Sequence, residues 1–152
     1  MQIFVLAVGR QKSGPEKDIF DTYAKRITWP FEVVEVTEHR KLNSNELKQR
    51  EGELLLAKIP EGAAVVVLDE RGKELDSRGL AAKIGEWRDT GIRHIVFVIG
   101  GADGIDEALK KRSDLMISLG RMTWPHMLVR ALVAEQVYRA QCILSGHPYH
   151  RD

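Results

Sequence analysis

Short apolar runs alternate with amphipathic segments along the whole chain. The apolar runs are almost continuous, which is typical of strands buried on both faces of a sheet. We predict strands at Ile3–Val8, Phe31–Val36, Ala63–Leu68, Ile95–Ile99 and Leu115–Leu119. Between these runs, apolar residues recur at helical spacing. We predict helices at Asp18–Ile27, Asn45–Lys58, Ser77–Thr90, Ile105–Arg112 and Met127–Leu144.

This alternation predicts an α/β fold, with a mostly parallel sheet covered by helices on both faces. No repeat, linker or low-complexity stretch interrupts it, so we expect one domain over residues 1–152. In such sheets ligands bind at the carboxyl ends of strands. The candidate strand ends are Gly9, Leu68–Asp69, Gly100–Gly101 and Leu119–Gly120.

Composition narrows the function only slightly. The chain is 43% hydrophobic and 30% charged, with a net charge of +1, so any RNA binding must rest on a local patch. Cys142 is the single cysteine, which excludes a disulfide framework and a cysteine-based zinc site within one chain. The first apolar run is too short for a signal peptide, and no stretch is long enough to span a membrane. We expect a soluble cytoplasmic protein without a metal.

The stretch HIVFVIGGADGID, residues 94–106, ends a strand in glycines. It matches neither the dinucleotide fingerprint G-x-G-x-x-G nor a Walker-type phosphate loop, which disfavours NAD or ATP. The simplest interpretation of these glycines is a tight turn from strand to helix that needs glycine.

The loop GRMTWP, residues 120–125, places Met122 and Trp124 beside a glycine. Large apolar groups in a loop suggest a slot lined by backbone amides, suited to a flat, partly polar ligand such as adenine. Alternatively, Trp124 fills the core beneath the last helix.

The tail SGHPYHRD, residues 145–152, combines an aromatic ring, two imidazoles and a guanidinium. Aromatic stacking beside basic groups is how proteins hold unstacked RNA bases. The alternative is a frayed terminus.

Several motifs together resemble the SPOUT-class ribosomal RNA large subunit methyltransferase H family. They are LAVG at 6–9, VIGGADG at 98–104, RMTWPH at 121–126, EQVYRA at 135–140 and HPYHR at 147–151. The resemblance runs from Met1 to the tail. It implies an α/β knot with a deep C-terminal trefoil, and S-adenosyl-L-methionine as cofactor.

The resemblance also implies a homodimer with active sites between subunits. The implied substrate is the pseudouridine in the helix 69 loop of 23S rRNA, methylated at N3 within the assembled ribosome. The cofactor loops carried over from the family are Leu68, Gly100, Leu119, Gly120, Arg121, Met122, Thr123 and Trp124.

Methylation at N3 requires loss of an imide proton, for which a histidine base is suited. We expect Tyr149, His150 and Arg151 to contact the substrate and to be catalytic, with His126 as a further candidate base. Arg130 and Arg10 are expected as additional substrate contacts, although Arg10 could equally be a solvated surface charge.

Three alternatives remain open. The first is an α/β nucleotide-binding module or hydrolase that uses the glycine turn for phosphate. The second is a non-catalytic dimer that docks on ribosomes through its C-terminal face. The third is a SPOUT methyltransferase with another RNA target.

Overall fold

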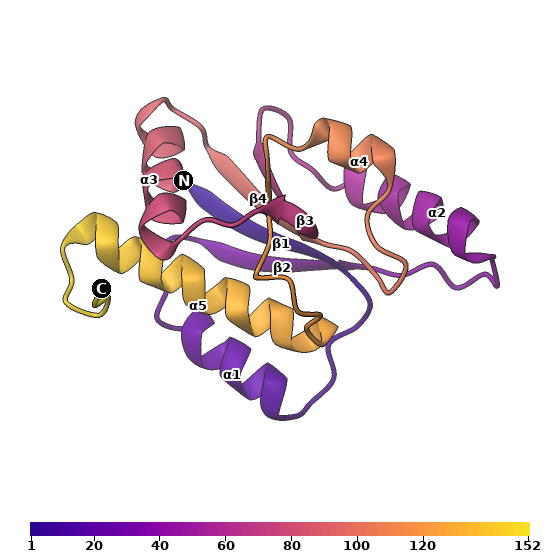
Figure 1. The fold of residues 1–152 in the computed structure, drawn as a ribbon, viewed down its shortest axis with the longest axis horizontal. Coiled ribbons are helices and arrows are strands. Elements are labelled where there is room, and N and C mark those ends of the chain that lie inside the picture. The colour runs from indigo at the N-terminus through magenta and orange to yellow at the C-terminus, as the bar shows by residue number, and fades with distance from the viewer.

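A parallel five-stranded sheet forms the centre of the molecule, in the order β2-β1-β4-β3-β5 (Figure 1). The computed structural model describes all residues 1–152. Its strands are β1 (Gln2–Val8), β2 (Phe31–Val36), β3 (Ala64–Lys73), β4 (His94–Ile99) and β5 (Leu115–Ile117). Its helices are α1 (Pro15–Ala24), α2 (Ser44–Leu56), α3 (Ser77–Asp89), α4 (Glu107–Arg112) and α5 (His126–Ser145). The predicted α/β fold with a parallel sheet is confirmed.

Strand β1 lies between β2 and β4, and its side chains pack on both faces of the sheet. Successive side chains of a strand point to opposite faces. Ile3, Val5 and Ala7 therefore pack into one core, while Leu6 and Val8 pack into the other. Burial on both faces explains why this strand is apolar without alternation.

The two faces of the sheet are covered by different helices. α3 and α5 pack on the first core, and α1 lies against α5. α2 and α4 cover the second core, and Figure 1 shows these two helices together on the other side of the sheet. No helix is both long and apolar enough to cross a membrane.

The predicted end of the third strand is wrong. We expected this strand to end at Leu68, but β3 continues through the charged segment DERGK to Lys73, with an irregular register against β5 between Leu68 and Lys73. A Cβ at Gly72 would lie 2.6 Å from the carbonyl carbon of Ile117, so only glycine allows this approach.

Other element boundaries differ by a few residues. α1 begins at Pro15 rather than Asp18, because proline is favoured in the first turn of a helix. β5 ends at Ile117, and α4 begins only after Asp106, whose carboxylate caps it by accepting from Ala108 N at 3.3 Å. The residues between these ends form the loops of the site.

Candidate active site

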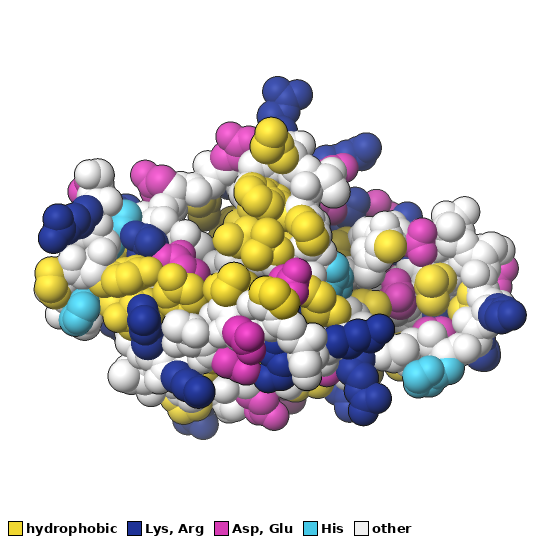
Figure 2. Space-filling view, turned by 90° about the horizontal axis from the view of Figure 1, so that it is seen from below, with side chains coloured by type: hydrophobic (Ala, Val, Ile, Leu, Met, Phe, Trp, Pro, Cys, Tyr) yellow, Lys and Arg dark blue, Asp and Glu magenta, His cyan; other side chains and the backbone are white.

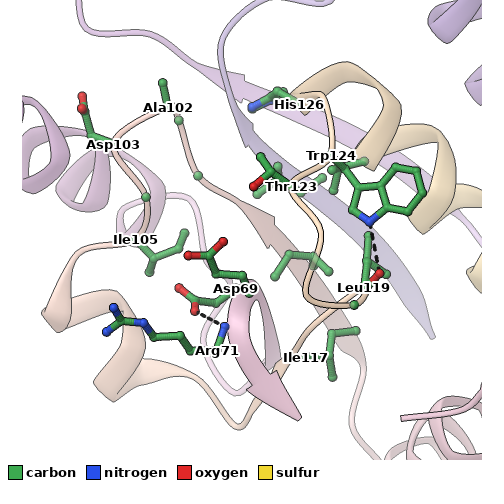
Figure 3. A pocket seen from close by; sticks show the side chains of 18 of the residues that line it. Asp69, Arg71, Ala102, Asp103, Ile105, Ile117, Leu119, Thr123, Trp124 and His126 are labelled. Carbon is green, nitrogen blue, oxygen red and sulfur yellow. Dashed lines mark hydrogen bonds between the residues drawn. The ribbon is translucent and has the colours of Figure 1, made fainter. Parts of the chain in front are cut away.

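A pocket opens where β3, β4 and β5 end and where α5 begins (Figure 3). Its volume is about 750 Å³, within the range typical of small-molecule sites. Leu68, Ile99, Ile117 and Val129 contribute apolar lining. The location fits the rule that ligands bind at the carboxyl ends of parallel strands.

The first wall of the pocket is the loop Gly100–Gly104. The loop is closed by a 3.1 Å hydrogen bond from Gly104 N to Gly101 O. A Cβ at Gly100 would lie 2.6 Å from Ile105 Cδ1 and 2.9 Å from Gly104 O, so a side chain there would displace the loop. Gly101 and Gly104 also form an antiparallel bridge, whereas the N–H groups of Ala102 and Asp103 donate to no other protein atom and can bind a polar ligand.

The second wall is the loop between β5 and α5. Ser118 Oγ donates to Gly120 O at 2.7 Å and accepts from Gly120 N at 3.1 Å. Gly120 has a φ of 106°, a conformation that favours glycine. The indole Nε1–H of Trp124 donates to Leu119 O at 3.1 Å (Figure 3). These hydrogen bonds between side chains and the backbone fix the shape of the loop.

Two large apolar side chains of this loop are open to solvent. Met122 is 76% exposed and Trp124 is 41% exposed, and both line the pocket. Trp124 therefore does not fill the core beneath α5, and that alternative is wrong. Thr123 also lines the pocket, whereas the exposed Arg121 does not. Of the predicted cofactor residues, only Arg121 is outside this lining.

His126 begins α5 and faces the same pocket (Figure 3). Burial, followed by the positive charge of Arg130, lowers the pKa of its imidazole. A hydrogen bond with the backbone of Gly100 and the charge of Glu35 oppose this shift only in part. The buried Nε2 has no hydrogen-bond partner. A neutral imidazole in this position can accept a proton at neutral pH.

Arg130 is placed differently from our prediction. It is 0% exposed, so its side chain reaches no solvent in this structure, and its role as a substrate contact stays a prediction. Its guanidinium donates to Glu35 Oε2 at 2.5 Å and to Gly9 O at 3.0 Å. Burial raises the pKa of Glu35, but the bonds from Arg130 and from Gln11 N outweigh it and leave that pKa lowered. Arg130 is thus a structural group that fixes the loop after β1.

Arg10 follows Gly9 in that loop and is exposed. Its charge contributes to the lowered pKa of Glu35. The loop position leaves Arg10 available to a phosphate, and its role as a substrate contact stays a prediction.

The tail is docked on the molecule, so the frayed-terminus alternative is wrong. The Tyr149 hydroxyl donates to Glu135 Oε1 at 2.9 Å, and the Arg139 guanidinium lies 4.8 Å from the Tyr149 ring centre. Burial and then hydrogen bonds to Tyr23 and Glu135 raise the pKa of Tyr149. The phenol is therefore a hydrogen-bonding and stacking group, not an acid at neutral pH.

His150 sits between a cation and an anion. Its Nδ1 lies 3.1 Å from Arg139 Nη1, and its Nε2 lies 3.0 Å from Asp152 Oδ1. A guanidinium only donates, so Nδ1 accepts and the proton is assigned to Nε2. Both ring nitrogens are occupied, and the catalytic role of His150 stays a prediction. Arg151 is exposed beside it.

The pocket and the tail lie at opposite ends of α5. This helix has 20 residues. At a rise of 1.5 Å per residue it is about 30 Å long. Figure 1 shows the C-terminus at the far end of α5 from the loop that precedes the helix. One chain therefore does not bring His126 together with Tyr149, His150 and Arg151.

Sequence reasoning missed two features of the pocket. Asp69 and Arg71 line it because β3 continues past Leu68, and Lys110 of α4 lines it as well. Glu51 is buried behind the glycine loop. Its spacing was the available signal, since Leu47, Glu51 and Leu55 are four residues apart and share one helix face.

The parallel sheet, the glycine-shaped pocket with free backbone donors and the neutral histidine define an α/β enzyme site for a small, flat cofactor. Comparison with known proteins agrees. A family model described as predicted SPOUT methyltransferase matches residues 1–150. The chain is 54% identical over 151 residues to "Ribosomal RNA large subunit methyltransferase H" of Paramagnetospirillum magneticum, covering 99% of both chains.

A protein of the same name from Rhodospirillum rubrum is also 54% identical, over 152 residues and 100% of both chains. Among solved structures, a probable methylase family protein from Haemophilus influenzae aligns with a TM-score of 0.56 at 8% identity. The alignment covers 97% of this chain and 67% of that one, and it supports the fold alone. The chain belongs to the SPOUT methyltransferase family, in the group named ribosomal RNA large subunit methyltransferase H. Its cofactor is S-adenosyl-L-methionine, and membership implies the trefoil knot.

Proposed function

We propose that this chain is a cytoplasmic, single-domain methyltransferase that methylates N3 of the pseudouridine in the helix 69 loop of 23S rRNA, acting on the assembled ribosome. The observation that carries the proposal is the pocket walled by Gly100–Gly104 and Leu119–Trp124, in a chain half identical to ribosomal RNA methyltransferases. The relatives' names support the large-subunit RNA as substrate. The family resemblance supports the particular base.

The pocket fits S-adenosylmethionine chemically. Backbone N–H groups of the glycine loop can donate hydrogen bonds to the polar edges of adenine and ribose, and the apolar lining can pack against the flat face of the ring. Glycine at 100 lets the backbone approach the ligand closely. The cofactor supplies a methyl group already activated by a sulfonium. The remaining task of the chain is alignment of donor and acceptor.

Bound S-adenosyl-L-methionine would supply the methyl group from its sulfonium and would leave as the neutral thioether. N3 must lose its proton for the methyl group to be accepted. We assign acceptance of this proton to His126, because its imidazole lines the pocket and its Nε2 has no hydrogen-bond partner. Tyr149, His150 and Arg151 are assigned to base stacking and to the charge that grows on the neighbouring carbonyl oxygens.

These assignments require two chains. The tail and the pocket of one chain are about 30 Å apart, the length of a 20-residue helix. A two-fold axis that pairs two α5 helices in antiparallel fashion would place each tail beside the partner's pocket. Figure 2 shows apolar side chains gathered in the middle of the face seen from below Figure 1. Such a patch marks a protein interface. We therefore propose a homodimer with composite sites.

The test is methyl transfer from labelled S-adenosylmethionine to ribosomes from cells lacking this protein, followed by mapping of the label. Label at N3 of the helix 69 pseudouridine is expected. Label elsewhere would keep the methyltransferase and refute the target. No transfer despite ribosome binding would favour the non-catalytic docking dimer.

The same assay on naked RNA tests the proposed ribosomal context. A chain with a net charge of +1 gains little from counterion release, so recognition must lean on the shape of the ribosomal pocket. Naked 23S rRNA should be methylated much more slowly than ribosomes. Equal rates would contradict the proposal that the assembled ribosome is the substrate.

A further inference from the structure

Glu51 is a buried acid that the proposed reaction does not use. It lies on the inner face of α2 and is only 7% exposed. The other two buried polar residues, Ser118 and Arg130, both have hydrogen-bond partners. Glu51 makes no ion pair, and its Oε1 is buried without a hydrogen-bond partner. A buried carboxyl group without a partner costs stability, so its presence calls for a function.

The carboxyl group of Glu51 lies directly behind the glycine loop. A Cβ built on Gly101 would lie 2.9 Å from Glu51 Oε1 and 3.0 Å from its Oε2. The carboxyl group therefore occupies the space that a side chain at position 101 would need. The pocket is lined by the same loop, and Glu51 itself is not part of that lining.

The next residue of α2 contacts the other end of the same loop. A Cβ on Gly52 would lie 2.8 Å from the Cβ of Asp106, the residue that caps α4. Two successive residues of one helix thus abut both ends of the segment Gly101–Asp106. α2 is a rigid support for this wall of the pocket.

We propose that Glu51 is a positioning residue that holds the loop Gly100–Gly104 in the shape that binds S-adenosylmethionine. It acts through the loop, by packing its carboxyl group against the backbone of Gly101 in the space that a side chain at that position would need. The inference rests on the assignment of this pocket to the cofactor.

Burial, and secondly the charge of Asp103, raise the pKa of Glu51, so its surroundings disfavour the ionised carboxylate. A glutamine side chain has nearly the same shape as that of glutamic acid and keeps an acceptor oxygen. Glutamine should therefore replace Glu51, whereas alanine should leave the loop unsupported.

Calorimetric titration of S-adenosylmethionine into the folded protein tests this role. Glu51→Ala should raise the Kd at least tenfold, and Glu51→Gln should stay within threefold of the unaltered protein. At saturating cofactor, single-turnover methyl transfer by Glu51→Ala should recover to within threefold. The matched control is Glu53→Ala, an exposed acid on the same helix, which should leave the Kd unchanged.

Gly52→Ala provides a second, independent perturbation from the other end of the loop, and it should also raise the Kd. A Kd within twofold of the unaltered protein in Glu51→Ala would overturn the proposal, as would equal losses in Glu51→Gln and Glu51→Ala. If the unaltered protein itself bound no S-adenosylmethionine, the cofactor assignment of the pocket would fail instead. The experiment needs no RNA, so failure of the RNA target leaves it intact.

Discussion

Heterodimers of two variant chains test whether the pocket at one end of α5 works with the tail at the far end of the partner's α5. In the proposed dimer, each active site takes its pocket from one chain and its tail from the other. One variant chain carries Gly100→Val, which forces side-chain atoms into the space held by Ile105 and Gly104. A second carries Tyr149→Ala and Arg151→Ala, which remove the tail contacts. Each homodimer should be inactive.

Two heterodimers then distinguish the arrangements. When the pocket variant pairs with the tail variant, one site carries both defects and the other carries none. With one intact site of two, activity should be about half that of the unaltered dimer. When an unaltered chain pairs with a chain carrying all the substitutions, each site has one defect. That heterodimer should be inactive.

Sites within single chains predict the reverse result, with no activity in the first heterodimer and about half in the second. The assay is methyl transfer to ribosomes by heterodimers purified through two different affinity tags. Titration with the cofactor, carried out in parallel, should show a stoichiometry of one intact cofactor site in each heterodimer. Activity of the second heterodimer without activity of the first would refute the reasoning. A monomeric protein at assay concentrations would refute it equally.

Three further substitutions separate chemistry from structure. His126→Gln should slow single-turnover methyl transfer on the order of 100-fold. Because the pKa of His126 is lowered from its ordinary value of 6.5, the imidazole is neutral above pH 6.5. The rate of the unaltered protein should therefore fall only below that pH, and a pH–rate profile of the variant should lack this fall. Arg130→Met should lower the free energy of unfolding by about 2–4 kcal/mol in urea titrations, because it leaves Glu35 without its buried partner; unchanged stability with weakened RNA binding would restore the substrate-contact hypothesis. Tyr149→Phe removes the hydroxyl that bonds to Glu135 and Tyr23 and should cost about 1–2 kcal/mol of stability. A larger loss of ribosome affinity, measured by filter binding, would show that the hydroxyl also contacts the substrate.

The strands and their arrangement could be predicted because burial leaves a strong pattern. β1 and β4 are apolar at nearly every position, and both lie inside the sheet. The end of β3 could not be predicted in this way. Residues 69–73 are charged or glycine and pair only with the short β5 at the edge of the sheet, so hydrogen bonding rather than apolar burial makes them a strand.

The pocket loops could be anticipated from glycine and aromatic residues in unusual positions, but the roles of individual side chains could not. An arginine in a sequence suggests contact with solvent or RNA, yet Arg130 is buried, and Glu35 and two backbone carbonyls accept from its terminal nitrogens. The burial of Glu51 was missed in the sequence for a different reason. A charged residue in an amphipathic helix suggests a solvated face, and only its spacing from Leu47 and Leu55 shows that it points inward.

The docked tail explains how a nearly neutral chain can still offer a local surface to RNA. Glu135 fixes Arg139, and Arg139 in turn contacts His150 and stacks on Tyr149. The tail is therefore ordered before any substrate arrives, which lowers the entropic cost of binding. The same rigidity fixes the tail about one helix length from its own pocket. A preorganised tail cannot swing back to reach that pocket, so in the proposed dimer the order that favours binding is also the reason that the second chain is required for catalysis.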